Sequence, residues 1–171
     1  GRDIEFDELR ATHDAIFVGV GLGSTRHLEI PGEELGGVID ALHFIEQIKT
    51  REWKNVPLGK HVAVIGAGNT AIDAVTQAKR LGAEQVMLIY RRTEHDAPAY
   101  DYEMELARKD GIEFHFQTTP IEILGDGRVS GLRCRTADGS EIVIACDQVI
   151  KAIGQQKMHS FFENVAGVAV D

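Results

Sequence analysis

The chain has 171 residues, of which 43% are hydrophobic and 26% charged, and its net charge is -9. These values are typical of one globular domain, and the acidic balance argues against nucleic acid or an anionic membrane surface as the main partner. The N-terminal residues do not resemble a signal peptide, and no apolar run approaches the ~18 residues of a membrane span. We therefore expect a cytoplasmic protein with no membrane segment.

The cysteines and histidines predict neither redox nor metal chemistry. Cys134 and Cys146 form no C-x-x-C motif, and the seven histidines include no helical pair at metal-binding spacing. We expect two buried free thiols and no metal site.

The first apolar run, residues 15–23, predicts a buried strand that ends in glycines close to a ligand. A second nucleotide turn is not predicted here, because no helical pattern follows and Pro31 would interrupt a helix. Apolar residues at helical spacing then predict an amphipathic helix from Val38 to Ile48.

The central stretch, residues 61–92, reads as a strand, a glycine turn, a helix and a second strand. Its first apolar run, residues 62–65, has the composition of a strand buried on both faces of a parallel sheet. In the turn, Gly66 permits the tight bend, Gly68 lets the backbone approach a pyrophosphate, and Ala71 allows close helix packing. The helix start also points free N–H groups at this place. We expect the diphosphate of a dinucleotide to bind at Gly66, Ala67, Gly68, Asn69, Thr70 and Ala71. The alternative is an ordinary Gly turn between a strand and a helix.

The second half of this stretch indicates which nucleotide binds. Gly82 is typical of a helix C-terminus, and residues 85–90 predict a strand that completes a βαβ unit of ~30 residues. An NAD-binding chain would then place an acidic residue for the ribose hydroxyls, whereas this chain has Arg91 and Arg92. Guanidinium groups suit the 2′-phosphate of NADP, so NADPH is predicted over NADH. The alternative is that one arginine only pairs with Glu94 on the surface.

The residues after Arg92 predict a ligand-side loop, a helix and further strands. Residues 93–97 should pass near the nucleotide, and Pro98 suits the first turn of a helix that runs to about Lys109. Glu103 in that helix is either a surface carboxylate or a polar contact across a cleft.

Strand patterns fill the C-terminal third of the chain. Residues 112–117 alternate with period two, and three short runs joined at glycine turns predict an antiparallel meander (residues 121–124, 129–134 and 141–145). The apolar strand 149–153 then ends at Gly154.

Taken in order, these features resemble the NADPH domain of the two-dinucleotide-binding-domain flavoproteins. The likeness is to the branch that holds the glutamate synthase small subunit and the flavin-containing part of dihydropyrimidine dehydrogenase, and residues 30–33 and 103–107 also look like that branch. In this family two strand-end glycine motifs mark the crossings between an FAD domain and an inserted NADPH domain. Here these motifs read Gly19-Val20-Gly21 and Ala152-Ile153-Gly154.

The expected fold class is α/β, a three-layer Rossmann-like NAD(P)-binding domain with a parallel sheet and an antiparallel β-meander. The resemblance implies that residues 1–60 are a crossover segment from an absent FAD domain. Residues 61–154 would be the NADPH-binding domain, and residues 155–171 would return toward the FAD domain.

The resemblance also implies a function, in which NADPH passes hydride to FAD and electrons move on to a partner subunit. FAD would belong to the remainder of the flavoprotein chain, because its fingerprint is absent here, as is the branch's iron-sulfur segment. The glycine turn would hold the pyrophosphate and the two arginines the 2′-phosphate. Ala152, Ile153 and Gly154 would pass near the nicotinamide, and no catalytic side chain or metal is expected.

Two other functions remain open. One is a self-sufficient NADPH-dependent reductase, against which the absence of a Tyr-x-x-x-Lys proton donor argues. The other is a non-catalytic NAD(P)-sensing module. The choice between the glutamate synthase and dihydropyrimidine dehydrogenase types is also open, and the isolated chain is expected to bind nucleotide without turnover.

Overall fold

The computed structural model describes residues 3–19 and 21–157. The chain divides into two compact units, one formed by residues 25–154 and the other by the two terminal segments on either side of it. Each unit is described by itself.

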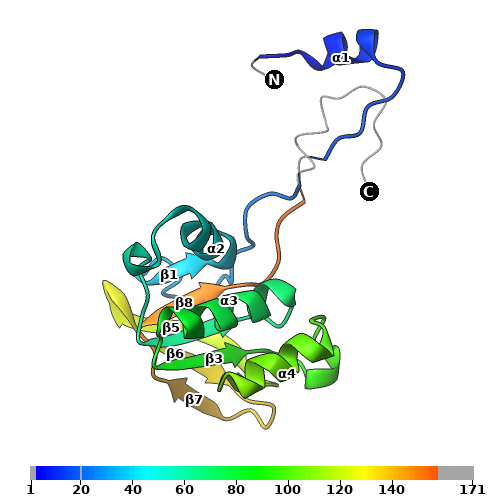
Figure 1. Cartoon of the computed structure of the whole chain (residues 1–171). Helices are drawn as coiled ribbons and strands as arrows, with labels where there is room; N and C mark the ends of the chain where they lie inside the picture. Colours follow the sequence, from blue (N-terminus) through cyan, green and yellow to red (C-terminus); the bar gives the residue numbers. More distant parts are fainter. Residues whose placement is uncertain (1–2, 20, 158–171) are drawn as a thin grey trace. The chain divides into compact units, whose positions relative to one another are not determined.

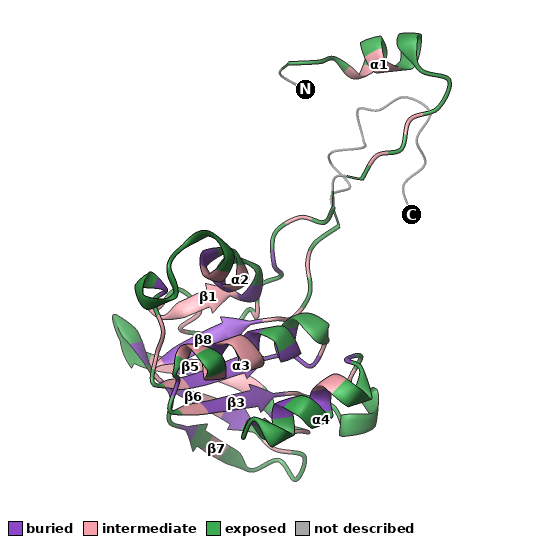
Figure 2. Ribbon diagram, in the orientation of Figure 1, coloured by how far each residue is buried: buried purple, intermediate pink, exposed green. Residues whose placement is uncertain are grey.

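The centre of the larger unit is a five-stranded parallel sheet with the order β1-β8-β2-β3-β4. Its strands are β1 (Val38–Asp40), β8 (Gln148–Lys151), β2 (His61–Ile65), β3 (Gln85–Ile89) and β4 (Glu113–His115). Strand β2 lies between β3 and β8, with Val64 opposite Leu88 on one side and Ile150 on the other. Strands β2, β3 and β8 are almost entirely buried (Figure 2), as their apolar composition predicts.

Successive side chains of the parallel strands enter two different cores, because they point to opposite faces of the sheet. Val62 and Val64 pack with the helices α2 (Ala41–Thr50), α3 (Asn69–Leu81) and α4 (Asp101–Lys109). Ala63 and Ile65 pack instead with an antiparallel sheet, β5 (Thr119–Asp126), β6 (Arg128–Arg135) and β7 (Glu141–Ile144). Figure 1 shows the three helices on one side of the parallel sheet. The predicted three-layer fold with its meander is therefore confirmed.

Both cysteines lie in the core between the two sheets. Cys134 and Cys146 are buried and free, as predicted. Burial raises the pKa of each thiol to about 12, so both remain protonated at neutral pH.

Two predicted helix starts are wrong by about one turn. Residues 38–40 form β1 rather than the start of α2, because the β-branched Val38 and Ile39 pair with β8 at the sheet edge. Helix α4 begins at Asp101 rather than Pro98, because the bonds described below hold residues 99 and 100 against the glycine turn. The pairing of β1 also places residues 25–60 in the same compact unit as residues 61–154. The assignment of residues 1–60 and 155–171 to crossings from an FAD domain stays a prediction.

The smaller unit contains α1 (Phe6–Thr12), which has no buried residue. The prediction of a buried strand over residues 15–23 is wrong, because the described residues there form no strand and the Phe17 side chain is 95% exposed. A strand requires a neighbouring strand to pair with. The two terminal segments of this unit are bonded to each other just after this stretch, where Gly23 N–H donates to Gln156 O (2.8 Å) and Gln155 Nε2 donates to Gly23 O (2.8 Å).

In the part of the chain that the structure describes, no helix has the length and apolar character needed to cross a membrane.

Candidate nucleotide site

The glycine turn joins the ends of three parallel strands. Gly66 N–H donates to Ile89 O at the end of β3 (2.9 Å), and Ala152 N–H donates to Ile65 O at the end of β2 (2.8 Å). Gly66 has a φ of +129°, and a Cβ there would lie 2.3 Å from the carbonyl oxygen of Ala152. Both the conformation and the close approach require glycine.

This turn lies where an open parallel sheet usually binds a ligand. From β2 the chain moves outward through α3 to β3 and through α4 to β4, whereas β8 and β1 lie on the other side of β2. The connections therefore diverge at β2 and β8, and a crevice forms at the carboxyl ends of strands at such a point. Gly66 and Ala152 follow these two strands.

Gly68 is glycine for a different reason from Gly66. It is the N-cap of α3 with a φ of -87°, and a Cβ there would meet only Pro98 Cγ at 3.8 Å, an ordinary contact. The packing of the protein therefore does not require glycine at this position. A missing Cβ leaves the backbone open to a ligand, which is the role predicted for Gly68.

The start of α3 presents N–H groups and positive charge of the helix dipole. Gly68 O accepts bonds from Ala71 and Ile72 (2.8 and 3.1 Å). The N–H groups of Asn69 and Thr70 have no carbonyl acceptor within α3, because they lie in its first turn. The first turn contains no acidic side chain, so an anion meets no like charge there. Ala71 is fully buried, which allows the close packing predicted for it.

The residues just before α4 are bonded to the turn, whereas the closeness of residues 93–97 to the nucleotide stays a prediction. Ala99 N–H donates to Ala67 O (3.1 Å), and Tyr100 N–H donates to Asn69 Oδ1 (3.2 Å). Glu103 in α4 accepts a bond from the Tyr102 hydroxyl (3.1 Å).

Arg91 and Arg92 follow β3 with both side chains exposed. The main chain around Arg91 is bonded to the segment before β5. Thr118 N–H donates to Tyr90 O, and Gln117 N–H donates to Arg92 O (both 2.9 Å). Within residues 3–19 and 21–157 neither guanidinium has an ion pair or a side-chain hydrogen bond.

The surface alternative for these arginines is wrong. Glu94, in the short helix η2 (Glu94–Asp96), pairs with Arg108 Nη2 at 2.8 Å and not with Arg91 or Arg92. Among the described residues no carboxylate forms an ion pair with either arginine, so both guanidinium groups after β3 are available to an anionic ligand.

The two predicted strand-end motifs belong to different units of the chain, and the second of them begins at this turn. Ala152 touches Gly66, Ile153 packs in the core between the sheets, and Gly154 O accepts a bond from Arg26 N–H (3.0 Å). Gly19 and Gly21 belong to the smaller unit, and Val20 lies outside the described residues. A role for Gly19, Val20 and Gly21 in cofactor binding stays a prediction.

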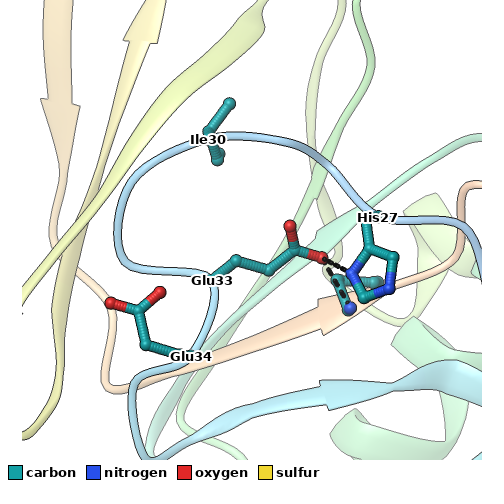
Figure 3. Close-up of a pocket in the computed structure, with 5 residues that line it drawn as sticks. His27, Ile30, Glu33 and Glu34 are labelled. Carbon is teal, nitrogen blue, oxygen red and sulfur yellow. Dashed lines mark hydrogen bonds and ion pairs between the residues drawn. The ribbon is translucent and has the colours of Figure 1, made fainter.

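A charge cluster at the end of β8 was not expected from the sequence. Lys151 Nζ lies 2.7 Å from Glu33 Oε1 and 3.2 Å from Asp40 Oδ1, and the Lys151 and Glu33 side chains are only 9% and 14% exposed. The Glu33 carboxylate also accepts bonds from Leu28 and Glu29 N–H and borders a cavity of about 360 Å³ with His27 and Ile30 (Figure 3). Ion pairing thus holds residues 27–34 against the strand that leads to Ala152.

The charge state of this cluster follows from its contacts. Burial alone would raise the pKa of Glu33, but bonds from Lys151 and from the backbone bring it below the ordinary value. Burial alone would lower the pKa of Lys151, but the two carboxylates raise it. One sequence signal could have revealed the cluster, namely a lysine inside the apolar run 149–153, which must find an opposite charge when buried.

In the described ranges, 3–19 and 21–157, no three His, Cys, Asp or Glu side chains gather in a way that could hold a metal ion.

Residues 3–171 match the family described as pyridine nucleotide-disulphide oxidoreductase. A subunit beta of the NADPH-Fe(3+) oxidoreductase of Geobacter sulfurreducens is 34% identical over 99% of this chain. The glutamate synthase [NADPH] small chain of Escherichia coli is 35% identical over 90% of it. The chain spans 28% and 38% of the lengths of these two relatives.

Solved structures show the same fold. The crystal structure of T. acidophilum thioredoxin reductase superposes with a TM-score of 0.72 at 22% sequence identity. The match covers 86% of this chain and 46% of the reductase chain. FprA of Mycobacterium tuberculosis in complex with NADPH superposes with a TM-score of 0.71 at 22% sequence identity. This match covers 89% of this chain and 52% of the FprA chain.

Proposed function

Because the chain belongs to the pyridine nucleotide-disulphide oxidoreductase family, we propose that it is the NADPH-binding part of a flavin-dependent oxidoreductase. In this proposal hydride passes from the nicotinamide of NADPH to FAD, and electrons continue to a partner subunit. FAD would be held by the remainder of a longer flavoprotein chain. Two relatives carry NADPH in their names, and one is a subunit beta and the other a small chain, which supports both the nucleotide and the partner.

One observation carries the choice of nucleotide, which is that two exposed arginines follow β3 and that neither forms an ion pair within the described residues. NADPH differs from NADH only by its 2′-phosphate, which carries close to two negative charges. Arg91 and Arg92 are exposed, and with Glu94 held by Arg108 their charge is not neutralised. Planar guanidinium groups bind phosphate through charge-assisted hydrogen bonds.

The residues of the turn give the remaining binding and orientation. The open backbone at Gly68 and the N–H groups of Asn69 and Thr70 would hold the pyrophosphate. Ala152, fixed against Gly66, would limit how the nicotinamide end lies, together with Ile153 and Gly154. Bound NADPH supplies the hydride, so the protein needs to position and shield it rather than provide a catalytic side chain.

The finer assignments are part of the proposal. The glutamate synthase type is supported by the identity to that small chain, and the dihydropyrimidine dehydrogenase type stays a prediction, as does the cytoplasmic location. A self-sufficient reductase and a nucleotide sensor are less well supported, because the curated relatives are named as parts of larger oxidoreductases.

The test is calorimetric titration of the chain with NADPH and with NADH, before and after Arg91 and Arg92 are both changed to alanine. Two partly screened charge-assisted contacts should together contribute about 2 to 4 kcal/mol, so NADPH affinity should fall roughly 30- to 1000-fold. NADH affinity should stay nearly constant. Added salt should also weaken the preference for NADPH, because the contacts are ionic and exposed.

Arg80→Ala is the matched control for the loss of positive charge. Arg80 lies in the last turn of α3, about 16 Å along the helix from Asn69, and its removal should leave both affinities unchanged. Equal losses of NADPH and NADH binding in the double variant would mean that the arginines serve the pyrophosphate or the fold. A wild-type preference for NADH would contradict the proposal.

A further inference from the structure

We propose that Arg108 is a positioning residue for nucleotide specificity, which holds Glu94 away from Arg91 and Arg92 and so keeps both arginines free for the 2′-phosphate. This inference rests on the proposed NADPH function. It concerns a residue in α4 that need not touch the nucleotide.

The turn that follows the two arginines is acidic, which creates a problem for a phosphate site. Glu94 and Asp96 come two and four residues after Arg92. A carboxylate at this distance along the chain could pair with either guanidinium. Such a pair would place a negative charge where the phosphate has to bind.

Each of the two carboxylates has another partner in the structure. Asp96 Oδ2 accepts bonds from Thr93 Oγ1 (2.6 Å) and Thr93 N–H (3.1 Å). The second of these bonds is one half of a capping box at the start of η2, in which the Thr93 side chain accepts a bond from Asp96 N–H. The two bonds that Thr93 donates lower the pKa of Asp96, with a smaller contribution from the charge of Arg92. Asp96 is thus fixed by its own turn. Glu94 is fixed from outside that turn, by the 2.8 Å ion pair with Arg108.

Arg108 is itself held in place by a second contact. It lies in the last turn of α4, and its guanidinium carbon is 4.6 Å from the centre of the Phe114 ring. A guanidinium over an aromatic face is stabilised and keeps its planar donors available at the edge. Phe114 belongs to β4, which pairs with β3 (Gln85–Ile89), so the position of Arg108 is fixed relative to the strand that precedes Arg91.

The ion pair is open to exchange, which makes its effect measurable. The Arg108 and Glu94 side chains are 39% and 48% exposed, and exposed pairs of this kind are weak. Loss of Arg108 should therefore release Glu94 without unfolding the chain. The released carboxylate would compete with the 2′-phosphate by roughly the strength of one exposed pair, about two- to fivefold in affinity.

The experiment measures dissociation constants for NADPH and NADH by calorimetry on the wild-type chain and on Arg108→Gln, Glu94→Gln and the double variant. We expect Arg108→Gln to weaken NADPH binding about two- to fivefold and to leave NADH binding unchanged. Adding Glu94→Gln to Arg108→Gln should restore NADPH binding, because the competing charge is then gone. The rescue distinguishes positioning from direct contact with the phosphate.

Arg133→Gln is the matched control, because Arg133 makes a comparable exposed ion pair with Glu122 (2.6 Å) in the meander. It should change neither affinity. The inference is overturned if Arg108→Gln leaves the NADPH to NADH ratio unchanged, or if the double variant shows no recovery. A wild-type chain with no preference for NADPH would overturn the proposed function itself, and the inference with it.

Discussion

Two stretches of this chain have nearly the same sequence character and different structures. Residues 15–23 and residues 62–68 are both apolar runs that end in closely spaced glycines. The second forms β2 and a tight turn, with its strand residues buried. The described part of the first forms no strand and leaves Phe17 exposed.

The difference lies in the partners that the chain offers to each run. Strand β2 has β3 on one side and β8 on the other, so its backbone N–H and C=O groups are paired and its side chains enter two cores. Residues 15–19 meet no strand in the part of the chain that the structure describes. An apolar run therefore becomes a strand only where a sheet can receive it.

Among the changes in these two stretches, Gly66→Ala should reduce the free energy of unfolding the most. The added Cβ would lie 2.3 Å from Ala152 O in a backbone with a φ of +129°, so both the strain and the clash must be relieved by moving β8. We expect a loss of about 3 kcal/mol or more in the free energy of unfolding. Chemical denaturation followed by circular dichroism measures it.

Gly21→Ala is the corresponding change in the other stretch. Gly21 also has a positive φ, +77°, but nothing lies within 4 Å of its would-be Cβ, and it is outside the larger unit. Gly21→Ala should therefore leave the unfolding transition of the larger unit unchanged. Similar losses for Gly66→Ala and Gly21→Ala would show that conformation alone, and not the approach of β8, decides the cost.

The sequence predicted those parts of the fold that depend on local pattern. The βαβ unit and the meander follow from spacing and residue type, whereas the sequence left open whether Arg91 or Arg92 pairs with Glu94. The start of α2 could not be predicted, because Val38 and Ile39 suit both a helix and a strand until β8 is present to pair with them. The cluster of Lys151, Glu33 and Asp40 joins residues 118 and 111 positions apart, and such a contact leaves little trace in local pattern.

Lys151→Met should reduce the free energy of unfolding less than Gly66→Ala does. It tests which interaction holds the loop at residues 27–34. Removal of the lysine leaves the Glu33 carboxylate mostly buried without its charge partner. We expect a loss of about 2 to 3 kcal/mol in the free energy of unfolding at pH 7. Adding Glu33→Gln should recover part of the loss, because no uncompensated charge is then buried. No recovery would mean that the lysine stem, and not its charge, stabilises the loop.

The same variant has an expected pH dependence. The folded state lowers the pKa of Glu33, so the pair's contribution is present above the unfolded pKa, about 4.3, and is lost as pH falls through the folded pKa. The folded state raises the pKa of Lys151, so the contribution is present below about pH 10.4 and is lost as pH rises further. The difference between wild type and Lys151→Met should therefore be largest near neutral pH and shrink in acid.

In the proposed function, the turn after β2 and the two arginines after β3 form the nucleotide site. The most direct measurement is a two-dimensional amide NMR titration of the chain with adenosine 2′,5′-bisphosphate and, separately, with adenosine 5′-monophosphate. The two ligands differ only in the 2′-phosphate. We expect both to shift the amide signals of Gly66, Gly68 and Asn69, and only the bisphosphate to shift those of Arg91 and Arg92. Shifts confined to residues 15–23, or identical shifts at the arginines with both ligands, would contradict the account.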